Sequence, residues 1–178
     1  MVVGLLGLWL GCDAPPKPPV SWQTVVSQSG RYSIDLPAYL EAGYDMHEYA
    51  DLQYYNLERS IFLLGIEDAK ANLGAIRRLR LKVGGYFAFV EDNVLEKADS
   101  TACEAREHFV PSGDPARNAR VGDYYVVNQA MGQEPVYYRI AVYESEELFL
   151  QLVIWMPYEK HCDMRPMVDR ITRSVQFL

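Results

Sequence analysis

Residues able to do acid–base or nucleophilic chemistry are few and scattered in this chain. Its histidines are His47, His108 and His161, and no nucleophile elbow, phosphate-binding loop, dinucleotide fingerprint or zinc-protease helix accompanies them. The acidic residues are spread along the sequence, so they nominate no pair of catalytic carboxylates. We therefore predict that the protein is not an enzyme and that it uses no cofactor.

One loop keeps an alternative hypothesis open. His47 lies in a polar stretch rich in tyrosine, residues 44–49, where an imidazole can bind a metal ion or a small ligand. Such a histidine is more often simply exposed. The alternative function is a small hydrolase or a ligand-binding enzyme, with its site near residues 38–51.

The three cysteines, Cys12, Cys103 and Cys162, set a second question. In an exported protein, where disulfides persist, Cys103 and Cys162 form an even pair and a possible disulfide. The alternative is two unrelated thiols. Because His161, Cys162 and Asp163 are consecutive, they lack the spacing of a tetrahedral metal site, and we expect no metal there.

The N-terminal segment indicates where in the cell the protein is located. Residues 1–11 are uncharged and almost wholly apolar, too short to span a bilayer but suited to the apolar region of a signal peptide. The small residue before Cys12 resembles the lipobox of bacterial lipoproteins, although Trp9 stands where that pattern prefers leucine and no basic residues precede it. The resemblance implies lipidation of Cys12, for example by palmitate; the alternative is an apolar segment packed on the domain, with a free Cys12 thiol.

The following residues fit a tethered protein. Residues 13–19 contain four prolines, which favour an extended spacer. We predict a signal peptide over residues 1–11, an anchor and linker over 12–21, and one domain over 22–178. The protein would then be lipid-anchored to a membrane of the bacterial cell envelope, on its periplasmic or extracellular side.

Composition limits the partners. The chain has 178 residues, a hydrophobic content of 49%, a net charge of −7 and a pI near 5.0. This length and hydrophobic content are typical of one globular domain. The acidic balance argues against nucleic acid and against attachment to anionic lipids by charge. A lipid anchor and a protein partner in the envelope are therefore expected.

Thirteen tyrosines, some in adjacent pairs, are the last compositional signal. Neighbours on a strand point to opposite faces, so each pair should place one ring inside and one outside. Outward tyrosines suit a recognition surface; the alternative is strand propensity and cross-strand packing. The candidate binding residues are His47, Tyr54, Tyr124 and Tyr137.

Hydrophobic periodicity predicts an antiparallel sheet with helices. Alternation or short apolar runs indicate strands over residues 31–37, 53–57, 60–66, 103–110, 123–131, 136–143 and 148–156. The strand over 60–66 is nearly all apolar, which predicts cover on both faces. Residues from 76 onward show helical spacing, with the helix proper expected after the basic cluster at 77–82. A second helix is expected over 164–174, with Asp163 as N-cap.

This order of elements resembles the Mog1/PsbP-like fold. The resemblance rests on residues 30–37 (GRYSIDLP), residues 65–70 (GIEDAK), and a closing helix that runs into residues 173–177 (RSVQF). It covers roughly residues 22–178 and implies an α+β domain, an antiparallel β-sheet sandwiched by helices. Members of this fold are mostly binding or accessory proteins, and many bacterial lipoproteins among them have no known role. The resemblance therefore implies a binding or accessory role without catalysis.

Overall fold

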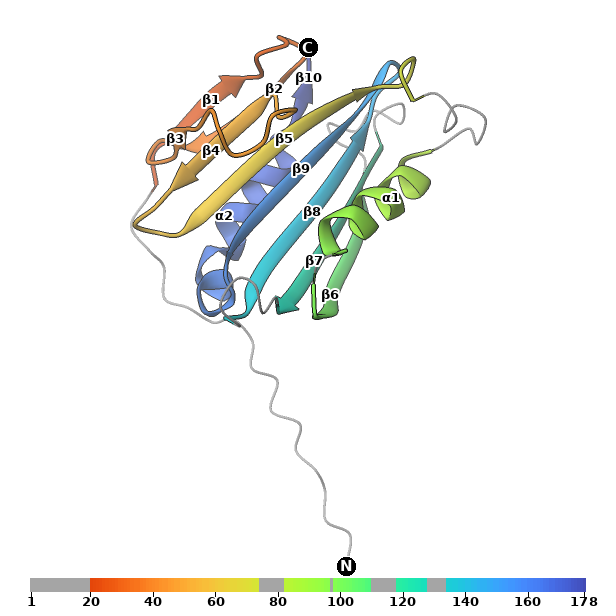
Figure 1. The fold of residues 1–178 in the computed structure, drawn as a ribbon. Helices are drawn as coiled ribbons and strands as arrows, with labels where there is room; N and C mark the ends of the chain where they lie inside the picture. Colours follow the sequence, from red (N-terminus) through yellow and green to blue (C-terminus); the bar gives the residue numbers. More distant parts are fainter. Residues whose placement is uncertain (1–19, 74–81, 97, 110–117, 128–133) are drawn as a thin grey trace, which may run out of the picture.

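The computed structural model describes residues 20–73, 82–96, 98–109, 118–127 and 134–178. Figure 1 shows a large twisted sheet with one helix in front, one helix behind and a small sheet at one side. The predicted signal peptide, Cys12 and most of the proline-rich linker lie outside the described residues. Their predictions are therefore not tested by the structure.

The large sheet has seven strands, all paired antiparallel. Their spatial order is β3 (Glu41–Ala42), β4 (Leu52–Asn56), β5 (Ile61–Ala69), β9 (Leu148–Pro157), β8 (Val136–Glu144), β7 (Asn118–Val127) and β6 (Ser100–Phe109). The small sheet contains β1 (Trp22–Val26), β2 (Tyr32–Pro37) and β10 (Gln176–Phe177), with β2 in the middle.

The two helices cover opposite faces of the large sheet (Figure 1). Helix α1 (Val83–Leu95) buries one apolar side against β7, β8 and β9. Helix α2 (His161–Arg173) follows β9 through a short 3-10 turn (Tyr158–Lys160) and, with the small sheet, covers the other face. We call the α1 side the front face and the α2 side the back face. The observed architecture is the predicted α+β one.

Most predicted elements are confirmed with small changes in their ends. Strands β1 and β3 were not expected from the sequence. The first helix begins at Val83, after the basic cluster, as predicted; residues 74–81 lie outside the described part. The predicted cap of the second helix is wrong, because Lys160 occupies the N-cap position and Asp163 lies in the first turn. An acidic residue there still interacts favourably with the helix dipole.

Strand β5 departs from the prediction in an informative way. Its back-facing residues Ile61 and Leu63 are fully buried, as expected of a central strand. Its front-facing residues Phe62, Leu64 and Ile66 are only half-buried, because α1 lies over β7, β8 and the adjoining edge of β9. The apolar front of β5 is therefore not covered by any described helix.

Candidate functional site

A row of aromatic side chains crosses the front face. Strand register places Tyr55 opposite Phe62, Phe62 opposite Trp155, and Trp155 opposite Tyr138. Directly paired residues point to the same side of a sheet, so these four rings form one line, which we call the aromatic row. All four are half-buried.

Three rings of the row, Phe62, Trp155 and Tyr138, stack in series. The centroids of Phe62 and Trp155 are 5.3 Å apart with an interplanar angle of 13°, and those of Tyr138 and Trp155 are 6.2 Å apart at 15°. Partial burial raises the pKa of the Tyr138 hydroxyl, so it stays neutral at physiological pH. A stacked row presents an uncharged apolar surface with a few polar tips, which suits recognition of another apolar surface.

Helix α1 and the loop over residues 43–50 border this surface. On one side, Phe89 of α1 is 44% exposed and packs beside Tyr86, whose hydroxyl donates to Asp68 of β5. On the other side, the loop over residues 43–50 folds onto β4. The buried amide of Gln53 holds that loop, accepting from the Met46 and His47 backbone N–H groups and donating to the His47 carbonyl.

The surface continues into a small hollow beside Trp155. The hollow has a volume of about 150 Å³ and is lined mainly by apolar side chains, among them Phe62, Pro135, Val136, Trp155 and Met156. The exposed Glu134 lies at its margin. We call the half-buried front of β5 and β9, together with the aromatic row and this hollow, the open face.

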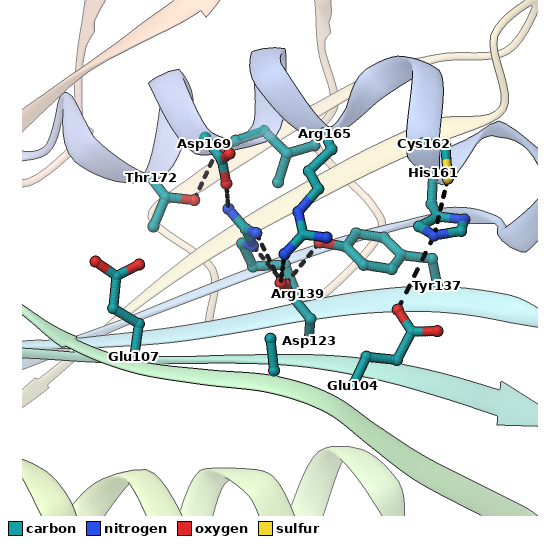
Figure 2. A network of polar contacts seen from close by, with 12 residues as sticks. Glu104, Glu107, Asp123, Tyr137, Arg139, His161, Cys162, Arg165, Asp169 and Thr172 are labelled. Atoms are coloured by element: carbon teal, nitrogen blue, oxygen red, sulfur yellow. Dashed lines mark hydrogen bonds and ion pairs between the residues drawn. The ribbon is translucent and has the colours of Figure 1, made fainter. Parts of the chain in front are cut away.

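A second candidate lies on the back face, where charged residues meet beneath α2 (Figure 2). Arg139 of β8 donates to both oxygens of Asp123 of β7, with Nε–Oδ1 at 2.6 Å and Nη2–Oδ2 at 2.8 Å. The Tyr137 hydroxyl donates to Asp123 Oδ1 at 2.6 Å. Arg139 also pairs with Asp169 of α2, and Arg165 Nη2 lies 3.7 Å from Asp123 Oδ2.

This buried network is satisfied by its own members. The side chains of Asp123 and Arg139 are each 6% exposed. Burial opposes the charge of Arg139, but the hydrogen bonds that Arg139 donates to Asp123 outweigh this effect and raise the Arg139 pKa. Burial also raises the pKa of Tyr137. Bidentate, charge-assisted bonds of this kind fix geometry, so the network fastens α2 to β7 and β8.

The predicted cysteine pair does not form in the structure. Cys103 is exposed and its thiol is free. Register places Cys103 opposite Tyr124, whose ring belongs to the front-face core, whereas Cys162 lies on α2 at the back. The two residues therefore lie on opposite faces of the sheet, and a disulfide cannot join them without backbone movement.

The four predicted binding residues do not come together. His47 is exposed in its loop, where its Nδ1 accepts from the Tyr49 N–H at 3.2 Å. Tyr54 packs partly into the back-face core. Tyr124 and Tyr137 are each 1% exposed, one on the front face and one on the back. The prediction that Tyr124 and Tyr137 are surface binding residues is wrong, because both side chains are buried.

The expectation that adjacent tyrosines on a strand point to opposite faces is confirmed on β7 and β8. Each adjacent pair on β7 and β8 has one buried ring and one outer ring, and the outer members are Tyr125 and Tyr138. The sequence analysis missed Phe62 and Trp155. The signal for Phe62 was present in the apolar strand over 60–66, which the sequence predicts to be covered on both faces, and Trp155 lies in the apolar strand predicted over 148–156.

Among the described residues, no group of three or more His, Cys, Asp or Glu side chains is placed to hold a metal ion. In the same part of the chain, no helix combines the length and the apolar character needed to cross a membrane.

Comparison with known proteins gives the fold. No protein-family profile and no curated protein sequence matches the chain. Solved structures do match: the cyanobacterial PsbP protein of Synechocystis has a TM-score of 0.64 at 11% identity, covering 95% of this chain and 99% of the other.

Two further structures agree. The Ran-binding protein Mog1p of Saccharomyces cerevisiae has a TM-score of 0.58 at 8% identity, covering 89% of this chain and 96% of its own. LpqN of Mycobacterium tuberculosis, involved in cell envelope biogenesis, has a TM-score of 0.57 at 8% identity, covering 89% and 91%. At these identities the likeness concerns architecture, and the chain therefore has the Mog1/PsbP-like fold.

Proposed function

We propose that this protein is a lipid-anchored, non-catalytic binding or accessory factor for another component of the bacterial cell envelope. The observation that carries the proposal is the open face. It is an apolar surface of Phe62, Trp155, Tyr138 and their neighbours that the described helices leave uncovered. Contiguous exposed apolar patches with aromatic residues commonly mark interaction sites.

The proteins of similar fold support this role. One is a Ran-binding protein and another is involved in cell envelope biogenesis. These roles belong to those proteins, and fold alone does not transfer them. The Cys12 lipobox resemblance and the proline-rich spacer favour the envelope as the place of action. An anchored domain would meet its partner at the membrane surface.

Site-specific photo-crosslinking in cells tests the binding role. A photoreactive amino acid at Trp155 should give a discrete adduct of one envelope component. The same group at Gln23, an exposed residue of β1 in the small sheet, is the control and should give none. Equal adducts from both positions would argue for unspecific collisions and against a binding role of the open face.

The anchor is tested separately. Wild-type protein should incorporate labelled fatty acid and fractionate with membranes, and Cys12→Ala should do neither. Equal labelling of the two forms would remove the lipid anchor from the proposal but leave the binding role standing.

A further inference from the structure

The open face has the dimensions of a missing helix. Helix α1 lies mainly over β7 and β8 and covers Phe149 at one end of β9. The front of β5 from Phe62 to Ile66 and the Trp155 end of β9 are only half-buried. Strands are about 4.8 Å apart, so the distance from β4 to β8 is about 14 Å, while an α-helix with its side chains is about 10–12 Å wide. The loop over 43–50 occupies the front of β4 and closes the other side.

The length of the surface gives the size of the occupant. Its front-facing residues run from Phe62 to Ile66 on β5 and from Gln151 to Trp155 on β9, and all of them are half-buried except Val153, which is buried. Each segment spans about 14 Å at about 3.4 Å per residue. A helix of about nine residues covers that length. It would bury its apolar side by placing residues at positions i, i+3, i+4 and i+7 on this floor.

The border also selects the charge of the occupant. Glu41 is paired in register with Tyr55, so it stands at the end of the aromatic row. Glu96 follows α1 as its C-cap, and Glu134 lies at the hollow beside Trp155. Two more exposed carboxylates belong to the bordering loop, Asp45 and Glu48. An apolar floor bordered by carboxylates favours a positively charged partner.

We propose that the open face binds the apolar side of a positively charged amphipathic helix of a partner protein, laid beside α1. This rests on the proposed binding role and specifies the class of partner. A flat lipid surface fits less well, because α1 and the loop over 43–50 stand above the floor on either side. The net charge of −7 also disfavours an anionic lipid surface.

A model peptide tests the proposal directly. The probe is a fourteen-residue helix of leucine and lysine, and its matched control has the same leucines with glutamate in place of lysine. The protein is the full chain with Cys12→Ala, Trp9→Phe and Trp22→Phe, kept free of detergent, so that Trp155 is its one tryptophan. Trp155 emission should change saturably as the lysine peptide is added. The glutamate peptide should bind with an affinity at least tenfold lower.

Variants locate the binding. Leu64→Asp in the centre of the open face should lower the affinity for the lysine peptide by about 30-fold, as expected for a central contact. The triple change Glu41→Gln, Glu96→Gln and Glu134→Gln should weaken it several-fold. The matched control changes three exposed glutamates elsewhere, Glu58→Gln, Glu146→Gln and Glu159→Gln, and should leave the affinity nearly unchanged.

Three results would overturn the proposal. They are equal binding of both peptides, equal loss in both triple variants, or a Trp155 response to phosphatidylglycerol vesicles or to self-association with none to the lysine peptide. A specific crosslinked partner at Trp155, combined with no binding of the lysine peptide, would keep the binding role and reject the cationic helix. The two proposals can therefore fail separately.

Discussion

At the scale of single residues, the ion pair of Asp123 and Arg139 shows how a buried charge depends on its partner. Replacing Arg139 by Met keeps the side-chain bulk but leaves the Asp123 carboxylate buried without its bidentate donor. Arg165 Nη2, at 3.7 Å, cannot make an equivalent bond. We expect the free energy of unfolding to fall by about 3–5 kcal/mol, measured by urea denaturation followed by circular dichroism.

An exposed ion pair in the same region provides the control. Glu107 pairs with Arg173 while the two side chains are 52% and 54% exposed. Because solvent screens such pairs, Glu107→Gln should cost no more than about 1 kcal/mol. Similar losses in the two variants would mean that burial does not govern the strength of these pairs.

At the scale of elements, β5 carries two neighbouring leucines with opposite roles. Leu63 faces the back core and is fully buried, whereas Leu64 faces front and is half-buried. Leu63→Ala should lower the free energy of unfolding by about 2–5 kcal/mol, and Leu64→Ala by only about 1 kcal/mol. Thermal unfolding measures both, and a larger loss for Leu64→Ala would show that its front face is covered.

The sequence predicts elements better than it predicts cover. Alternation locates β2, and apolar runs locate β5 and β9, because these patterns are local. Whether the front of β5 is covered depends on β9, about ninety residues later in the chain, and on a helix of 13 residues that lies over β7 and β8. No local pattern contains that information, which is why the open face was missed.

The same reasoning explains the candidate tyrosines. The pair Tyr137 and Tyr138 predicts one inner and one outer ring, but strand parity alone does not say which ring meets a charge. Tyr137 is buried because Asp123 and α2 lie on its side of the sheet. Tyr138 is the outer ring because it stands beside Trp155 in front. The register between strands that are distant in sequence therefore determines which of the two rings is buried.

At the scale of the whole molecule, buried tyrosines should set the alkaline limit of the fold. The pKa is raised, mainly by burial, for five tyrosines that are at most 1% exposed: Tyr32, Tyr86, Tyr124, Tyr137 and Tyr143. In the unfolded chain these hydroxyls ionise near pH 10. Below that pH these hydroxyls are protonated in both the folded and the unfolded state, so their ionisation does not reduce the stability. Above it, only the unfolded state loses these protons.

The free energy of unfolding should therefore fall steeply above about pH 10. Each such tyrosine contributes a slope of about 1.4 kcal/mol per pH unit, and five together about 7 kcal/mol per pH unit. The ultraviolet absorbance of tyrosinate should show the exposed tyrosines titrating first, and the buried ones should ionise only as circular dichroism reports unfolding. Tyr143→Phe should reduce the slope, whereas Tyr49→Phe, at a site 69% exposed, should not. A gradual titration of all thirteen tyrosines in a folded protein would mean that these rings are accessible, and that the two faces of the sheet are far less tightly closed than the core described above.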